Sequence, residues 1–364
     1  MVDVGKLTLG VIWDGESVTA TDIISTRPMA AQVLKGKTPM QVVQIVPLLF
    51  SVCGRAQGAA AVAALQAAQQ TGKPASATLG RMIACEAMQE HLWRLLLNWP
   101  ELLGLEQQEQ RFAAWYALLR KIGAGEADMA VFLQQFERDA LGMPAAEWLA
   151  MSSFAELRAW WQSTDSPLAD TLARLAELEQ HRQDVNESRL LPAWSAAEAQ
   201  QACAGSWDAE FAARPQWQGA AAETGAWSYF ADSPLLRDVR QQSGSKALTR
   251  VLARLADVVA MAGGDFAARL DASSPAAGEG IAVARTARGL LLHRVSLDGD
   301  KVADYTIVAP TEWNFHPDGA FAQDMRGLQE HDGGMLEYRA QIEALSLDPC
   351  VAYEIEIKGE DERL

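Results

Sequence analysis

The sequence predicts an α+β protein in which a long helical body is framed by β-hairpins near both ends of the chain. Alternating apolar residues flank an Asp-Gly pair at each end, and apolar residues recur at helical spacing through most of the chain between them. With 364 residues and 49% hydrophobic residues, the chain can bury a large core. A helical body of about 250 residues framed by strands favours one domain over residues 1–364 rather than several small ones.

The two expected hairpins share the same turn chemistry. Residues 7–13 alternate in hydropathy, Asp14-Gly15 tolerates the left-handed conformation of a tight turn, and residues 18–24 return. Residues 290–297, Asp298-Gly299 and residues 301–309 repeat this arrangement near the other end. We therefore expect a small sheet, or a pair of sheets, built from both ends, with a further strand at 351–357.

Helical periodicity accounts for most of the sequence between the hairpins. An alanine-rich run at 59–68 would allow close approach of a neighbouring helix or ligand because alanine is small, and the alternative is that alanine stands there only as the best helix former. Pro100 is expected to stop one long helix. Residues 192–226 are expected to be irregular, and 271–280 (DASSPAAGEG) a loop or linker. The expected helices span 39–50, 59–68, 79–99, 107–122, 129–140, 145–161, 168–187 and 237–262.

Charge and composition exclude several classes of partner. There are 31 Lys and Arg against 47 Asp and Glu, a net charge of −16. Such an acidic surface repels phosphate backbones and anionic lipid, so neither nucleic acid nor a membrane is an expected partner. No secretory signal is visible, and the apolar stretches are too short to span a bilayer. We expect a cytoplasmic protein with reduced thiols.

Two of the four cysteines stand in suggestive contexts. Cys53 begins the alanine-rich helix in Val-Cys-Gly, and Cys350 follows Asp-Pro before the last strand. A helix N-terminus favours thiolate, and thiolates are soft ligands for iron, copper(I) or zinc. The alternative is that each is a small buried hydrophobe, which spacing alone favours and which we keep for Cys85 and Cys203. His293 is expected to be a core or edge histidine.

Three C-terminal segments, taken in order, resemble the end of a nickel–iron hydrogenase large subunit. They are Ala-Arg-Gly-Leu-Leu-Leu-His at 287–293, Asp-Tyr-Thr-Ile-Val-Ala-Pro-Thr-Glu-Trp-Asn at 304–314 and Asp-Pro-Cys at 348–350. N-terminal segments at 4–7, 27–30 and 51–56 resemble the EGHLR, RGxE and RICGVC motifs of that family. The resemblance covers roughly 1–100 and 280–357 and is weak over 105–275. It implies the large-subunit fold.

The resemblance also shows what this chain has lost. The family holds its metals with two CxxC pairs, and here Ala56 and Tyr353 replace the second cysteine of each pair. Strict carry-over would make Cys53 and Cys350 nickel ligands, leaving iron to sit differently. Two soft thiolates nevertheless suit a low-spin iron whose other positions are filled by diatomic ligands. We expect iron and no nickel.

Further replacements remove proton-handling groups and the protease site of the family. The opening Glu and His correspond to Val4 and Lys6, the RGxE acid to Ala30, and the histidine at the cleavage site to Glu356. The C-terminal tail, 354–364, is therefore expected to stay uncleaved. By resemblance, the cofactor-binding groups are retained: Arg288 and Thr311 stand at positions that contact the cyanides of the iron in the family, with Pro310 and the backbone of Ala287 shaping the pocket.

This pattern of loss and retention resembles the HupK/HoxV family of hydrogenase accessory proteins. It implies a non-catalytic scaffold on which iron carrying cyanide and carbon monoxide is held by Cys53 and Cys350 before delivery to the apo large subunit. Implied partners are maturation proteins of the HypC/HypD type and the large-subunit precursor. A metal-free chaperone that mimics the large subunit is the alternative, and a remodelled one-metal redox enzyme is less favoured because its proton groups are missing.

Overall fold

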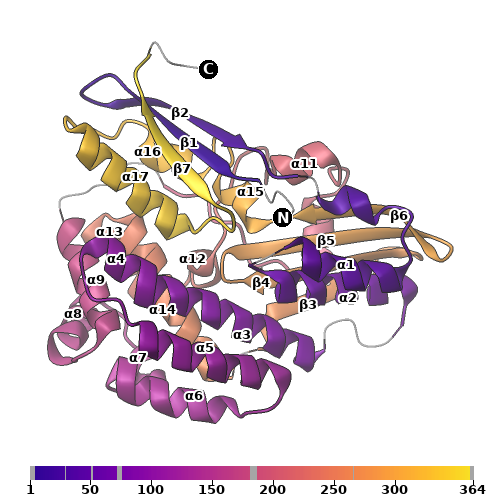
Figure 1. Ribbon diagram of the computed structural model, residues 1–364, viewed down its shortest axis with the longest axis horizontal. Helices are drawn as coiled ribbons and strands as arrows, with labels where there is room; N and C mark the ends of the chain where they lie inside the picture. The colour runs from indigo at the N-terminus through magenta and orange to yellow at the C-terminus, as the bar shows by residue number, and fades with distance from the viewer. Residues whose placement is uncertain are drawn as a thin grey trace. The chain divides into compact units, whose positions relative to one another are not determined.

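In the computed structural model, the chain forms two compact units, each built from segments far apart in sequence (Figure 1). The first comprises Met1–Ser76, Asn186–Thr224 and Leu270–Leu364, and the second comprises Ala77–Val185 and Gly225–Arg269. The structure describes residues 5–28, 30–50, 52–71, 76–180, 187–264 and 266–360. The expectation of a single domain over residues 1–364 stays a prediction.

The first unit contains a small sheet made by both ends of the chain. Strands β1 (Leu7–Trp13) and β2 (Val18–Ser25) form the expected antiparallel hairpin, with Gly15 at φ +100°. Strand β7 (Tyr353–Lys358) pairs in parallel with β1, giving the order β2-β1-β7. The buried face of β1 packs on α16 (Ala320–Met325) and α17 (Gly333–Leu347). The prediction of sheets built from both ends is confirmed.

The second sheet of this unit has the order β3-β4-β5-β6. Strands β5 (Gly289–Asp298) and β6 (Lys301–Val308) are the second expected hairpin, which is confirmed. Strands β3 (Leu270–Ser273) and β4 (Glu279–Thr286) show that the predicted loop at 271–280 is wrong except for its centre. Pro275 and Gly278 lie in the hairpin turn, and the residues on either side of that turn pair as strands.

Two N-terminal helices of this unit are α1 (Pro39–Leu49) and α2 (Gly54–Gln69), of which α2 packs on strands β4 and β5. The alanines of α2 are buried, and a Cβ added at Gly280 of β4 would lie 1.9 Å from the carbonyl oxygen of Ala64. The small residues of α2 therefore bring its backbone directly against the sheet. In the segment expected to be irregular, two short helices form, α10 (Ala196–Ala202) and α11 (Ala209–Ala213). The Ser195–Glu198 capping box starts the first of them.

The second unit is helical over its described residues. Three helix predictions in it are wrong: one helix continues where it was expected to stop, and two expected helices are divided. Helical structure continues past Pro100: α3 (Ala77–Trp93) is followed by a π-helical turn, η2 (Arg94–Asn98), and then by α4 (Trp99–Leu103). Pro100 lies in the first turn of α4, where the N–H group that proline lacks is not needed. Residues 145–161 divide into α7 (Ala145–Leu149) and α8 (Phe154–Ser163), where Ser153 caps a new helix.

The third break lies at Gly244, whose φ of +70° separates α13 (Pro234–Ser243) from α14 (Lys246–Ala262). The helix expected at 168–187 is α9 (Pro167–Leu178), and residues 181–186 lie outside the described residues. The unit is completed by α5 (Glu109–Ala124), α6 (Met129–Phe136), the π-turn η3 (Glu137–Leu141), α12 (Ala226–Tyr229) and the 3₁₀ turn η4 (Ala267–Arg269).

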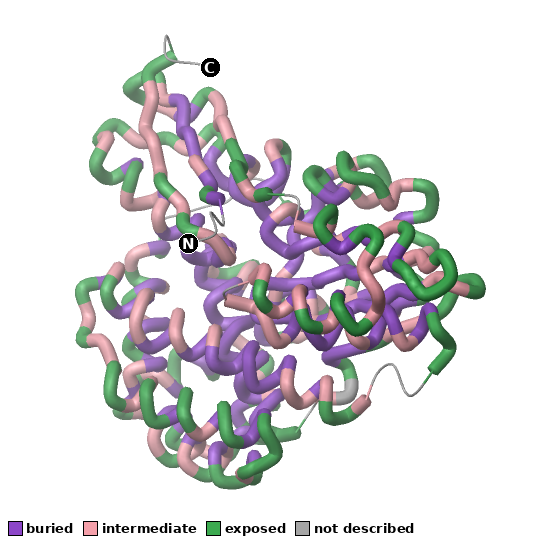
Figure 2. Tube along the Cα trace, turned by 45° about the vertical axis from the view of Figure 1, so that its right-hand side comes forward, coloured by how far each residue is buried: buried purple, intermediate pink, exposed green. Residues whose placement is uncertain are grey.

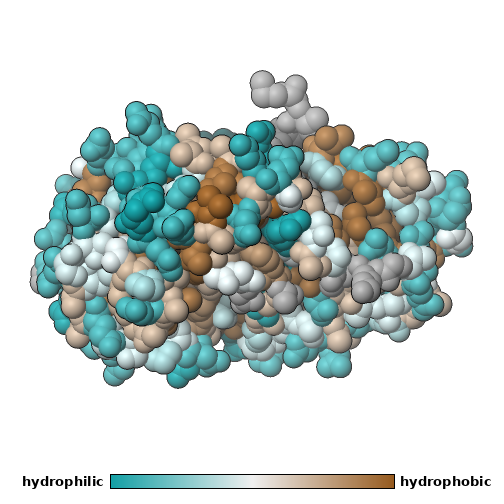
Figure 3. Space-filling model, turned by 90° about the horizontal axis from the view of Figure 1, so that it is seen from below, coloured by the Kyte–Doolittle hydropathy of each residue, from teal (hydrophilic) through white to brown (hydrophobic). Residues whose placement is uncertain are grey.

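Burial follows the elements of each unit, with buried residues along the strands of the second sheet and along α2 and α14 (Figure 2). The face seen in Figure 3 is mostly hydrophilic, with hydrophobic side chains gathered in separate patches. Among the described residues, no helix combines the length and the apolar character that crossing a membrane requires.

Candidate metal centre

Cys350 and Thr311 meet in the first unit, although they come from different elements. Thr311 lies in the first turn of α15 (Pro310–Asn314), directly after β6, and Cys350 lies between α17 and β7. The Thr311 hydroxyl donates to the Cys350 Sγ at 3.1 Å and accepts from the Cys350 backbone N–H at 3.3 Å. Thr311 is buried and Cys350 is half-buried, so the sulfur sits at the edge of the core with a defined hydroxyl partner.

Cys53 is the N-cap residue of α2 and is half-buried. Its own side chain makes no capping hydrogen bond. The amide nitrogen of Gln57, one turn further along α2, donates to the Cys53 Sγ at 3.9 Å. The expectation that Cys53 begins the alanine-rich helix is confirmed. Ala56, at the position of the family's second cysteine, is buried within α2 and leaves no sulfur there.

The guanidinium of Arg27, on the segment after β2, interacts electrostatically with both Cys350 and Cys53. Burial lowers the pKa of Arg27, but the negative charges of Cys350, Glu312 and Cys53 outweigh burial and raise it above its ordinary value. Both sulfurs therefore lie within electrostatic reach of one guanidinium. Sequence reasoning read Arg27 only as part of the RGxE-like motif and missed this position. The motif itself was the available signal.

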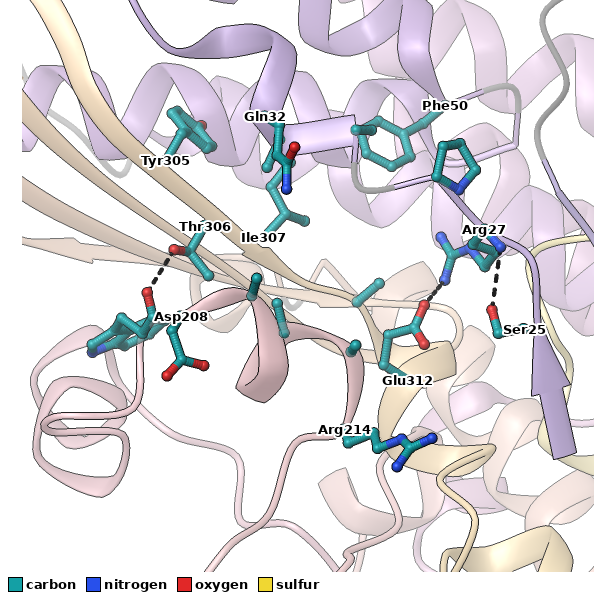
Figure 4. A pocket seen from close by; sticks show the side chains of 18 of the residues that line it. Ser25, Arg27, Gln32, Phe50, Asp208, Arg214, Tyr305, Thr306, Ile307 and Glu312 are labelled. Carbon is teal, nitrogen blue, oxygen red and sulfur yellow. Dashed lines mark hydrogen bonds and ion pairs between the residues drawn. The ribbon is translucent and has the colours of Figure 1, made fainter.

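Arg27 also forms an ion pair with Glu312 of α15 (Figure 4). Burial raises the pKa of Glu312, while the charge of Arg27 and its hydrogen bond act in the opposite direction. The pair is mostly buried, with side-chain exposures of 13% and 17%. The positive charge of Arg27 is thus paired with one carboxylate on the same side of the unit as the two cysteines.

Arg288 is held beside the same segment as Cys350. Its guanidinium Nη2 lies 3.4 Å from Oδ1 of Asp348, two residues before the cysteine, and both side chains are almost fully buried. Asp348 closes α17 with a φ of +57°, a conformation that Asp tolerates better than most residues. The Asp-Pro-Cys motif thus anchors Arg288 as well as presenting the sulfur.

The backbone on either side of Arg288 is fixed by Thr224 and Asn314. The amide of Asn314 accepts from the Thr224 N–H at 2.8 Å and donates to the Thr224 carbonyl at 2.9 Å, and the Thr224 hydroxyl accepts from the Leu290 N–H at 2.9 Å. Gly289 has a φ of +134°, and a Cβ there would lie 2.4 Å from Thr224 Cγ2. The glycine of the Arg-Gly motif is required by this close approach.

A cavity of about 460 Å³ adjoins the Arg27–Glu312 pair. Its walls come from β2 and the segment after it, from α11, from β6 and from α15 (Figure 4). Tyr305, Thr306 and Ile307 of β6 line it together with Phe50 and Arg214. Arg27 therefore belongs both to the surroundings of the thiols and to the wall of an open space.

The structure thus brings Cys350, Thr311 and, through Arg27, Cys53 into one neighbourhood, with Pro310 buried at the start of α15. Among the described residues, no three His, Cys, Asp or Glu side chains are grouped so that they could hold a metal ion. Cys85 and Cys203 are buried, and burial raises the pKa of Cys203 to about 12. Their expected role as small buried residues is confirmed. Val4, Met29 and Ser51 of the family-like motifs lie outside the described residues, as do 361–364 of the tail.

Comparison with known proteins identifies the family of this chain. Residues 234–355 match the family model described as nickel-dependent hydrogenase. The chain is 30% identical to the hydrogenase expression/formation protein HoxV of Cupriavidus necator over 92% of both chains. It is 31% identical to HupK of Azotobacter vinelandii and 33% identical to HupV of Azotobacter chroococcum, each over 97% of this chain and 98% of the relative.

Solved structures share the fold. The nickel–iron–selenium hydrogenase of D. vulgaris Hildenborough superposes with a TM-score of 0.61 at 15% identity, covering 94% of this chain and 95% of that chain. An NAD⁺-reducing nickel–iron hydrogenase gives 0.55 at 15% identity, covering 93% of each chain. The predicted hydrogenase large-subunit-like fold is confirmed. The relatives that match nearly full length place the chain by sequence: it belongs to the HoxV/HupK family of hydrogenase expression/formation proteins.

Proposed function

We propose that this chain is a non-catalytic carrier for an iron unit with cyanide and carbon monoxide ligands during maturation of a nickel–iron hydrogenase. Its relatives are named hydrogenase expression/formation proteins, which supports a role in maturation rather than in hydrogen chemistry. The observation that carries the proposal is the position of Arg27, which pairs with Glu312 next to the Thr311 that contacts the Cys350 Sγ, and which also interacts with the charges of Cys350 and Cys53. Two thiolates provide a soft donor set for iron and no second pair for nickel.

The surroundings of the thiols suit an anionic cargo. Cyanide nitrogens accept hydrogen bonds, and a guanidinium or a hydroxyl is the appropriate donor. Arg288, oriented by Asp348, and Thr311, in contact with the Cys350 Sγ, are the donors that the proposal assigns to the cyanides, with Pro310 shaping the wall. Arg27 adds a second positive charge that offsets the charge of the thiolates and the cargo.

Delivery requires that the carrier hold its cargo more weakly than the acceptor does. A large subunit with four cysteines offers a stronger site than two thiolates, so transfer runs toward the hydrogenase precursor. The proposed partners are maturation proteins of the HypC/HypD type that build the iron unit, and the large-subunit precursor that receives it. A cytoplasmic location belongs to the same proposal.

The test is an infrared spectrum of the protein purified without oxygen from cells that carry the maturation machinery. Cyanide and carbonyl stretching bands are expected in the wild-type protein and are expected to be lost in Cys53→Ala and Cys350→Ala. Cys85→Ala, which removes a buried thiol of the second unit, serves as the matched control and should keep the bands. A spectrum without bands from folded protein with intact partners would leave a metal-free chaperone as the function.

A further inference from the structure

Three buried side chains form a continuous series of hydrogen bonds from the Cys53 sulfur to the wall of the cavity. The amide nitrogen of Gln57 donates to the Cys53 Sγ at 3.9 Å, and its amide oxygen lies 2.8 Å from His293 Nε2. His293 Nδ1 lies 2.8 Å from the hydroxyl of Tyr305, a residue that lines the cavity. The exposed fractions of Gln57, His293 and Tyr305 are 1%, 0% and 4%.

These residues are brought together by the packing of α2 on the second sheet. Gln57 follows Cys53 by one helical turn, so both side chains lie on the same face of α2. His293 of β5 pairs with Ile307, and Tyr305 of β6 pairs with Val295, which makes the histidine and the tyrosine diagonal neighbours on one face of the sheet. Their rings meet edge to face with centroids 5.6 Å apart.

The orientation of the Gln57 amide, with its oxygen toward His293 and its nitrogen toward Cys53, fixes the hydrogen-bonding roles in the series. Burial lowers the pKa of His293 to about 3, so the ring is neutral near pH 7. The amide oxygen of Gln57 only accepts, so His293 Nε2 carries the hydrogen and donates it. The Nδ1 atom is then an acceptor, and the Tyr305 hydroxyl donates to it. Gln57 is left with its N–H group directed at Cys53.

We propose that Gln57 is a positioning residue of the iron carrier, which His293 and Tyr305 hold so that it donates a hydrogen bond to the metal-bound Cys53 thiolate. This inference rests on the proposed function. A hydrogen bond to a thiolate draws electron density away from the metal, and such outer partners orient the ligand and tune the site. With less density on the iron, less is donated back into bound carbon monoxide, and its stretching frequency rises.

A purely structural polar cluster would behave differently. Buried polar groups pair with one another in any fold, and removing one of them lowers stability. Such a loss changes the unfolding transition without altering the electron density on a metal held by Cys53. The carbonyl and cyanide frequencies therefore separate a positioning role from a structural one.

The test compares infrared spectra of loaded wild-type protein with Gln57→Met and Tyr305→Phe. Methionine keeps the approximate size of glutamine without its donor, and phenylalanine removes only the hydroxyl. Gln69→Met makes the same chemical change at an exposed position of the same helix and serves as the control. We expect the carbonyl band of Gln57→Met to move to lower wavenumber, with a smaller shift in the same direction for Tyr305→Phe and none for Gln69→Met.

Iron retention is the second readout. Loss of an outer-shell partner costs about 10- to 100-fold in metal affinity, so Gln57→Met should release iron to a chelator at correspondingly lower chelator concentration. Bands that coincide in wild type, Gln57→Met and Tyr305→Phe would overturn the positioning role and leave the carrier function intact. Absence of bands from the wild type would overturn both. If Gln57→Met does not fold, Tyr305→Phe, which preserves the packing, decides the question alone.

Discussion

Replacing Thr311 by valine tests whether one hydroxyl organises the Cys350 side of the site. Valine has the shape of threonine but can neither donate to the Cys350 Sγ nor accept from the Cys350 N–H, which Thr311 contacts at 3.1 and 3.3 Å. A hydrogen bond contributes about 0.5–1.5 kcal/mol net, so loss of the backbone contact corresponds to about 2- to 13-fold faster amide exchange. The Cys350 sulfur would lose its hydroxyl donor at the same time.

The assay is hydrogen–deuterium exchange followed by mass spectrometry of a peptide that contains Cys350. Thr311→Ser is the matched control, because serine keeps the hydroxyl and loses only a methyl group. We expect faster exchange in the valine variant and exchange close to wild type in the serine variant. Equal exchange in wild type and Thr311→Val would refute the assignment of Thr311 as the residue that organises Cys350.

Two further predictions concern the backbone near Arg288 and the buried charges of the second unit. Gly289→Ala should lower the free energy of unfolding by about 2–5 kcal/mol, because the added Cβ would lie 2.4 Å from Thr224 and φ is +134°. Gly299→Ala, in open space at φ +59°, should lower it by only about 1–2 kcal/mol. Equal losses for the two variants in thermal unfolding would contradict the packing argument. Burial raises the pKa of Asp257, but Arg269 and a hydrogen bond from His91 more than offset this and lower it well below its ordinary 3.8. Ionised Asp257 therefore contributes to the free energy of unfolding above pH 3.8, and this contribution is lost as the pH falls. Urea unfolding should show wild-type stability dropping between pH 5 and 3, and Asp257→Asn should already be less stable at pH 5, by about 3–5 kcal/mol, and should vary less with pH. If the unfolding free energy of Asp257→Asn fell with pH as much as that of the wild type, Asp257 would not be the source of the acid sensitivity.

Features that depend on local chemistry could be predicted from the sequence. The Asp14-Gly15 and Asp298-Gly299 turns require a backbone conformation that glycine and aspartate adopt readily. Both hairpins form where an Asp-Gly pair is flanked by alternating apolar residues. The continuation of a helix through Pro100 could not be predicted in the same way. It depends on a π-helical turn, and nothing in the local sequence distinguishes that turn from an ordinary helix end.

The site was predictable only through the order of its motifs. Cys53 and Cys350 are far apart in the sequence, and no spacing rule brings them together. The expected role of Thr311 toward the cyanides stays a prediction, and its contact with the Cys350 Sγ places it beside that cysteine. Arg27 and Gln57 were missed as site residues because their positions depend on how α2, β5 and the segment after β2 pack, which no single segment encodes.

The central claim, that this chain carries an iron unit and passes it on, is tested most directly by a transfer experiment. Wild-type protein showing cyanide and carbonyl bands would be mixed without oxygen with the purified apo large-subunit precursor, and the two proteins would be separated and measured by infrared spectroscopy. We predict that the bands leave this chain and appear on the precursor, in proportion to the iron that moves. Bands that remain on this chain, with a precursor able to accept iron from other maturation proteins, would contradict the carrier function.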